Sequence, residues 1–240
     1  MITDRAGLDW STPRSADRIA AAYRQSGFAI LSGLLAHAEV AALNDEMLRL
    51  VRGELGSIEG AITAAGLTDE ELPRSLLCAH MPHKISPLFR TTMRHPALLA
   101  ALNGIIGPDV KAMQSMAFIK AAGKPGQAWH QDETHIPTVT GHLTAAWIAL
   151  DAADPENGGL RAIPGSHRDG VLYPDRDIDD ARFDCTKEAY RFPYSDDGKV
   201  SRTALGHTSG QIATAAACVS DVDEPPSARG RGPWIDCGRG

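Results

Sequence analysis

Apolar residues recur at helical spacing at the start of the chain. Ser15 can cap a helix over residues 16–25, because a serine side chain accepts a hydrogen bond from the first free backbone amides. Three apolar residues fall on one side of this helix: Ile19, Ala20 and Tyr23. Residues 27–31 then read Gly-Phe-Ala-Ile-Leu, a short apolar run that predicts a buried strand.

Two more helices are expected before residue 110. The first covers residues 37–53 and the second covers residues 96–106, where Gly107-Pro108 ends it. In the first of these, five apolar residues recur near helical spacing: Val40, Leu43, Met47, Leu48 and Val51. We expect residues 1–109 to form a helical scaffold.

From Val110 onward the pattern changes to short strands separated by Gly/Pro turns. Strands are expected at residues 110–120, 129–135, 143–150 and 160–163. This spacing is typical of a β-sandwich or jelly roll, so residues 110–205 are expected to form a β core behind the helices. Residues 206–240 are expected to be an irregular tail of the same single domain, residues 1–240, since residues 221–240 are rich in Pro, Gly, Arg and Asp and carry no strand period.

Composition narrows the class of protein. The 240 residues are 43% hydrophobic and 22% charged, which is ordinary for a globular domain, and the net charge is −6. An acidic chain is a poor partner for nucleic acid or an anionic membrane surface. The first residues lack a signal-peptide core, and the four cysteines form no C-x-x-C pair, so a cytoplasmic protein with reduced thiols is expected.

Candidate metal ligands occur in the segment Trp129-His130-Gln131-Asp132. In an extended strand, side chains two residues apart lie on one face, so His130 and Asp132 can offer a nitrogen and an oxygen to one ion. Gln131 between them should point outward, on the other face. A zinc hydrolase site that adds His135 is an alternative, but His135 would face the opposite side of a continuous strand.

Several blocks in order around this segment resemble the phytanoyl-CoA dioxygenase family. They are Gln114–Lys120, Trp129–Asp132, Ala146–Leu150, Glu156–Leu160 and Pro164–His167. The apolar segment at residues 27–31 and the helix after it are similar to the start of that family. The resemblance covers roughly residues 16–194.

The resemblance implies a mainly β fold, a double-stranded β-helix (jelly roll, cupin-like) with a helical N-terminal layer. It also implies a non-haem Fe(II)/2-oxoglutarate-dependent dioxygenase, an oxidoreductase that hydroxylates a small organic substrate with O2 while 2-oxoglutarate is decarboxylated to succinate and CO2. Ascorbate would be supportive. Iron in this family binds two histidines and one carboxylate.

The same resemblance assigns roles to individual residues. His130 and Asp132 would be the first two iron ligands, while Gln114, Met116 and Trp147 would line the 2-oxoglutarate site. No catalytic residue is expected beyond the metal site. His167 belongs to a turn that recurs mostly for structural reasons, and Arg161 is expected to be a solvated strand residue.

Two positions compete for the role of third iron ligand. His207, in Gly206-His207-Thr208-Ser209-Gly210, partly matches the family's distal His-x-Ser pattern. If the chain is instead aligned by Phe192-Pro193-Tyr194, the position falls nearer Cys218. An alternative follows, a truncated or catalytically impaired jelly-roll binding protein that diverges after about Val200 and leaves the C-terminal part of the jelly roll incomplete.

Overall fold

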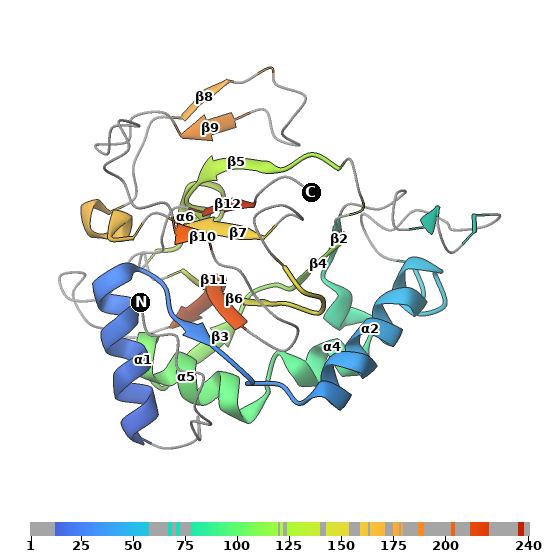
Figure 1. The fold of residues 1–240 in the computed structure, drawn as a ribbon, viewed down its shortest axis with the longest axis horizontal. Coiled ribbons are helices and arrows are strands. Elements are labelled where there is room, and N and C mark those ends of the chain that lie inside the picture. The colour runs from blue at the N-terminus through green and yellow to red at the C-terminus, as the bar shows by residue number, and fades with distance from the viewer. Residues whose placement is uncertain are drawn as a thin grey trace.

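Helices cover one side of a β core in the computed structural model (Figure 1). The structure describes residues 13–57, 67–68, 71–72, 78–119, 121, 124–139, 143–153, 159–162, 164–170, 175–177, 179, 187–189, 203–204, 212–220 and 235–237. The helices lie below one four-stranded sheet, and a second four-stranded sheet lies above it in Figure 1. The helical N-terminal part therefore packs against the first of these sheets.

The three helices expected from the sequence are confirmed, but the first already includes Ser15, so the cap expected at Ser15 is wrong. They are α1 (Pro13–Ser26), α2 (His37–Val51) and α5 (Pro96–Ile106). A shorter helix, α4 (Pro87–Thr92), and a 3-10 turn, η1 (Pro82–Lys84), connect the scaffold to the strands.

Helices α1 and α5 pack closely because Gly104 has no side chain. A Cβ atom at Gly104 would lie 2.9 Å from the backbone oxygen of Ala16. The core beneath these helices and α2 consists of Ile19, Ala29, Leu31, Leu34, Leu35, Val40, Leu43, Leu98, Ala101 and Leu102. Removing this apolar surface from water stabilises the scaffold that holds β1.

The sequence analysis wrongly placed one residue, Leu48, on the buried apolar face of α2. Leu48 is 42% exposed, whereas Leu50 is fully buried. The buried stripe follows Val40, Leu43, Leu50 and Val51, and Leu48 lies beside this stripe rather than within it.

The first large sheet is built around β11 (Ile212–Ser220). This strand pairs antiparallel with β6 (Thr144–Ile148) on one edge. On its other edge it pairs with β1 (Ile30–Leu31) and β3 (Val110–Ala112).

The second large sheet has the order β10-β7-β12-β5, and all its pairs are antiparallel. Its strands are β10 (Thr203–Ala204), β7 (Leu160–Ala162), β12 (Ile235–Cys237) and β5 (Gln127–His130). Two smaller sheets pair β2 (Cys78–His80) with β4 (Met116–Phe118), and β8 (Asp175–Asp177) with β9 (Lys187–Ala189).

Three expectations about strands need correction. The run 110–120 is two strands, β3 and β4, with different partners. The run 129–135 is a strand only to His130, since α6 (Asp132–His135) is a helical turn. The tail after residue 206, expected to be irregular, contributes β11 and β12. The alanine-rich β11 lacks a strand pattern in sequence, and its pairing on both edges supplies the stability that composition does not.

In the part of the chain that is described, no helix has the length and apolar character needed to cross a membrane.

Candidate metal centre

His130 and Asp132 converge where β5 gives way to α6. Gln131 between them is extended, with φ −111° and ψ 131°, so the alternation of side chains holds across it. His130 Nε2 lies 3.2 Å from Asp132 Oδ1, and the two side chains are 15% and 22% exposed. The sequence prediction that these two groups face one another is confirmed, although Asp132 starts a helical turn rather than continuing a strand.

This pair fits half of a metal site. Two adjacent ligands that are each about 2.1 Å from one ion lie about 3 Å apart, and the His130–Asp132 separation is compatible with this. Imidazole and carboxylate are the donors of the two-histidine, one-carboxylate iron sites. Among the described side chains no third histidine, cysteine or carboxylate completes a cluster, and His207 lies outside the described residues. The side chains of His135 and Arg161 also lie outside the described part.

Gln131 is buried rather than directed outward, which corrects the sequence prediction. Its side chain is 1% exposed, and its Nε2 donates to the backbone oxygen of Gly170 at 3.0 Å. The prediction failed because the turn over residues 164–170 lies against this side of the motif.

Glu133 is a residue of the site that the sequence analysis did not assign. It is 8% exposed, and its Oε1 accepts from the backbone N–H and the hydroxyl of Thr138 at 2.7 and 2.5 Å. Its Oε2 accepts from the Leu143 N–H at 3.1 Å. These bonds hold both ends of the segment that follows α6. The sequence shows a carboxylate directly after the motif, but nothing in it indicates that Thr138 and Leu143 bind this carboxylate.

A buried tyrosine lies under the same segment. Tyr23 Oη is 3.2 Å from Thr144 Oγ1. Burial raises the pKa of Tyr23 to about 12, and the negative charges of Asp132 and Glu133 act in the same direction. Tyr23 is therefore a neutral hydrogen-bonding group beneath the motif at any physiological pH.

The residues expected to line the 2-oxoglutarate site fall in two places. Gln114 Nε2 is 3.8 Å from Met116 Sδ, so these two side chains are together, and Met116 is 37% exposed. Trp147, on β6, packs with Ile30 against the buried cluster of Phe28, Leu160 and Ala162. The role of all three in binding stays a prediction.

Two histidines border the β2–β4 pair. His80 lies opposite Met116 in the strand register, and His83 Nδ1 is 2.6 Å from Ser115 Oγ. Partial burial, with Lys84 and Arg90 nearby, lowers the pKa of His83.

The 164–170 turn binds the carboxyl end of α1. This turn contains the 3-10 helix η2 (Ser166–Asp169). Three successive carbonyls of α1 each accept a hydrogen bond from it: Arg24 from His167 Nε2 at 3.0 Å, Gln25 from Arg168 Nη2 at 2.7 Å and Ser26 from Gly165 N at 2.9 Å. Carbonyls in the last turn of a helix lack partners within it, so the turn caps α1. His167 performs this structural role, as expected for a turn that recurs mostly for structural reasons.

Comparison with curated proteins gives related enzymes. An ectoine dioxygenase of Bordetella parapertussis is 33% identical over 162 residues, which are 64% of this chain and 50% of that protein. A phytanoyl-CoA dioxygenase of Arabidopsis thaliana is 38% identical over 96 residues, 39% of this chain and 33% of that protein. The chain spans about half the length of the ectoine dioxygenase.

Solved structures show the same fold. The iron-bound structure of EctD from S. alaskensis has a TM-score of 0.63 at 17% identity and covers 99% of this chain and 75% of that one. The epimerase SnoN, in complex with Fe3+, alpha ketoglutarate and nogalamycin RO, has a TM-score of 0.61 at 23% identity, covering 95% and 85%.

The family model described as "Phytanoyl-CoA dioxygenase (PhyH)" matches residues 23–214, most of the chain. That match includes the helical scaffold from Tyr23, the motif at His130 and Asp132, and the start of β11. The chain therefore belongs to the phytanoyl-CoA dioxygenase family.

Proposed function

We propose that this protein is an Fe(II)/2-oxoglutarate-dependent dioxygenase that hydroxylates a small organic substrate. The observation that carries the proposal is the convergence of His130 Nε2 and Asp132 Oδ1, at 3.2 Å, in a member of the phytanoyl-CoA dioxygenase family. Relatives named for ectoine and phytanoyl-CoA support a small-molecule substrate, without identifying it.

In this proposal His130 and Asp132 hold ferrous iron, with His207 as the third ligand. Iron held there would supply the oxidising power by which one atom of O2 enters the substrate as hydroxyl and the other enters succinate, while 2-oxoglutarate loses CO2. Gln114, Met116 and Trp147 line the co-substrate site. We further propose that the two four-stranded sheets are the two faces of a double-stranded β-helix.

The residues around the motif hold the ligands in place. Glu133 fixes the segment after α6 through three hydrogen bonds, and neutral Tyr23 supports Thr144 beneath it. Low exposure of His130 and Asp132 excludes part of the surrounding water, which strengthens their interaction with a cation.

The alternative of an impaired binding protein that diverges after about Val200 is not favoured. The family match continues past that point to residue 214. The segment that was expected to lack β structure supplies β11, the central strand of a sheet.

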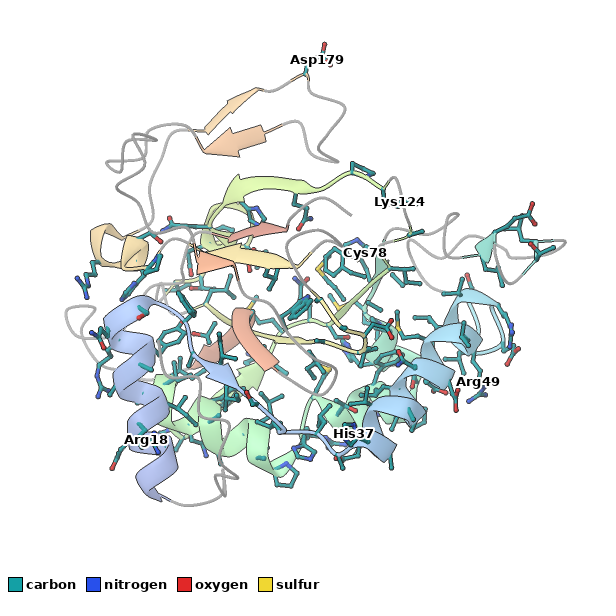
Figure 2. All side chains as sticks on the ribbon, in the orientation of Figure 1. Arg18, His37, Arg49, Cys78, Lys124 and Asp179 are labelled. Atoms are coloured by element: carbon teal, nitrogen blue, oxygen red, sulfur yellow. The ribbon has the colours of Figure 1, made fainter. Side chains whose placement is uncertain are left out.

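The test is 2-oxoglutarate decarboxylation with added ferrous iron and ascorbate, followed as succinate formation. The parent chain should form succinate, and His130→Ala and Asp132→Ala should reduce it by about 100-fold or more, because either change leaves iron under-ligated. His37→Ala is the matched control, since His37 is an exposed residue at the start of α2 on the helical side (Figure 2). Full activity in either ligand variant would contradict the proposal.

A further inference from the structure

Gln131 is held from outside its own segment, although it lies between the two candidate ligands. Its side chain is 1% exposed, and its amide donates to Gly170 O at 3.0 Å, a contact that spans 39 residues of sequence. A buried amide group must keep its hydrogen bonds, because losing one costs about 1–3 kcal/mol. The side chain of Gln131 therefore has a fixed position.

Gly170 is itself fixed by the turn that precedes it. Its backbone N–H donates to His167 O at 3.2 Å, and its φ is +80°, a conformation that glycine adopts without strain. His167, Arg168 and Gly165 attach this turn to the carboxyl end of α1. Since α1 is anchored in the core through buried Ile19, Ala20 and Tyr23, the acceptor of the Gln131 bond belongs to the rigid scaffold.

The backbone of Gln131 determines how the neighbouring side chains meet. His130 and Asp132 project from either end of this one extended residue, so a change of its φ or ψ would separate Nε2 from Oδ1. On the far side of Asp132, Glu133 is fixed by Thr138 and Leu143. The motif is thus restrained on both sides by groups that are not ligands.

We propose that Gln131 is a positioning residue, which ties the His130–Asp132 pair to the α1 scaffold through Gly170 and so sets the geometry of the metal site. This inference rests on the proposed function, because it presumes that the pair binds a metal. It assigns Gln131 no contact with the metal or the substrate. Groups that support metal ligands from outside typically contribute about 10-fold to 100-fold to metal affinity.

The test uses cobalt(II), whose visible spectrum reports ligand geometry, titrated into the metal-free full chain. Gln131→Met keeps the length and volume of the side chain and removes the donor, and Gln131→Asn keeps an amide that is too short to reach Gly170. Both should bind cobalt at least about tenfold more weakly and with an altered spectrum. Gln25→Met is the matched control, because Gln25 has an exposed side chain and only its backbone carbonyl is used.

Thermal unfolding of the metal-free variants separates positioning from general stability. If the variants are folded at the titration temperature but bind cobalt with the parent affinity and spectrum, the inference is overturned and the metal site stands. If neither variant folds, Gln131 is a structural residue and the positioning role is also overturned. If the parent chain itself binds no cobalt, the metal site fails together with the inference.

Discussion

The ring of His167 lies directly against the backbone of Gly27. A Cβ atom at Gly27 would be 2.5 Å from His167 Nδ1, a separation that packed atoms do not tolerate, and Gly27 has φ +84°. Gly27 follows α1, so the absence of a side chain there lets the 164–170 turn reach the helix end.

Gly27→Ala should therefore destabilise the fold by about 3 kcal/mol or more, from backbone strain and from displacement of His167. Gly33→Ala is the control, since Gly33 has φ +68° but open space around it, and it should cost only about 1–2 kcal/mol. Urea unfolding of both variants measures the difference. Equal losses would show that the His167 ring moves aside freely.

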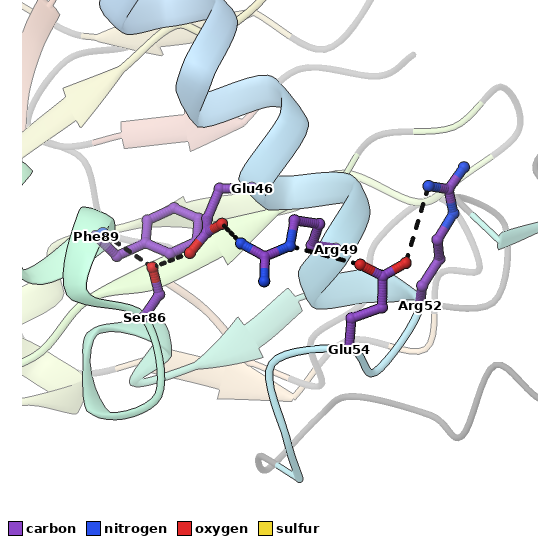
Figure 3. Close-up of polar contacts among 6 residues, drawn as sticks. All are labelled: Glu46, Arg49, Arg52, Glu54, Ser86 and Phe89. Carbon is purple, nitrogen blue, oxygen red and sulfur yellow. Dashed lines mark hydrogen bonds and ion pairs between the residues drawn. The ribbon is translucent and has the colours of Figure 1, made fainter.

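Ser86 links helices α2 and α4 through a buried carboxylate. Its hydroxyl donates to Glu46 Oε1 at 2.5 Å and accepts from Phe89 N at 3.2 Å, as Figure 3 shows. Ser86→Ala should cost about 2–3 kcal/mol, because it removes a helix cap and leaves a buried charge with one partner fewer. Arg49→Met is the control, since the ion pair between the half-exposed Arg49 and Glu46 contributes about 0.5 kcal/mol or less to the free energy of unfolding. If Ser86→Ala loses less stability in urea unfolding than Arg49→Met, Ser86 does not link the two helices as described.

Tyr23 should make stability fall at high pH. Folding raises the pKa of Tyr23 from 10.0 to about 12. Between pH 10 and 12 the tyrosine therefore ionises in the unfolded chain but not in the folded one, which favours unfolding. The contribution of Tyr23 to the free energy of unfolding is complete below pH 10 and is lost across this range. The loss amounts to about 2–3 kcal/mol. Tyr23→Phe should remove this part of the pH dependence while costing about 1 kcal/mol at pH 7 through the lost contact with Thr144. Identical slopes for parent and variant in urea unfolding above pH 10 would contradict the prediction.

Met116 and Trp147 should differ as variants, although the same role is expected of both. Met116 is 37% exposed, so Met116→Ala should leave stability within about 0.5 kcal/mol and raise the KM for 2-oxoglutarate about tenfold. Trp147 packs with Ile30 against the Phe28 cluster, so Trp147→Ala should raise KM and also cost about 3 kcal/mol. An unchanged KM in Met116→Ala would remove it from the co-substrate site.

His207→Ala should weaken cobalt binding by about 100-fold if His207 is the third ligand. Cys218→Ala tests the competing alignment, and the exposed His37→Ala serves as the control. If His207→Ala keeps the parent affinity for cobalt and Cys218→Ala loses it, the third ligand is Cys218 on β11.

The helices could be predicted from sequence because their signals are local. The boundaries of α5 were right at both ends, since Pro96 begins it and Gly107 ends it. The strand β11 was missed because its alanine-rich sequence has no alternation, and it is specified by neighbours on both edges.

The candidate site divides in the same way. His130 and Asp132 were predictable because they are two residues apart in sequence. The burial of Gln131 and the bonds of Glu133 were not, since they depend on Gly170, Thr138 and Leu143, which no local pattern connects to the motif.

The position of β12 has a consequence for folding order. Ile235 pairs with His130, and β12 lies between β5 and β7 in the sheet. The strand that carries His130 thus acquires β12 as its paired strand only after more than a hundred further residues have been synthesised, and contacts so distant in sequence form slowly. If His130 holds a metal as proposed, metal loading should follow the pairing of β12, and nascent chains that are shorter than residue 237 would expose this edge of β5 to aggregation.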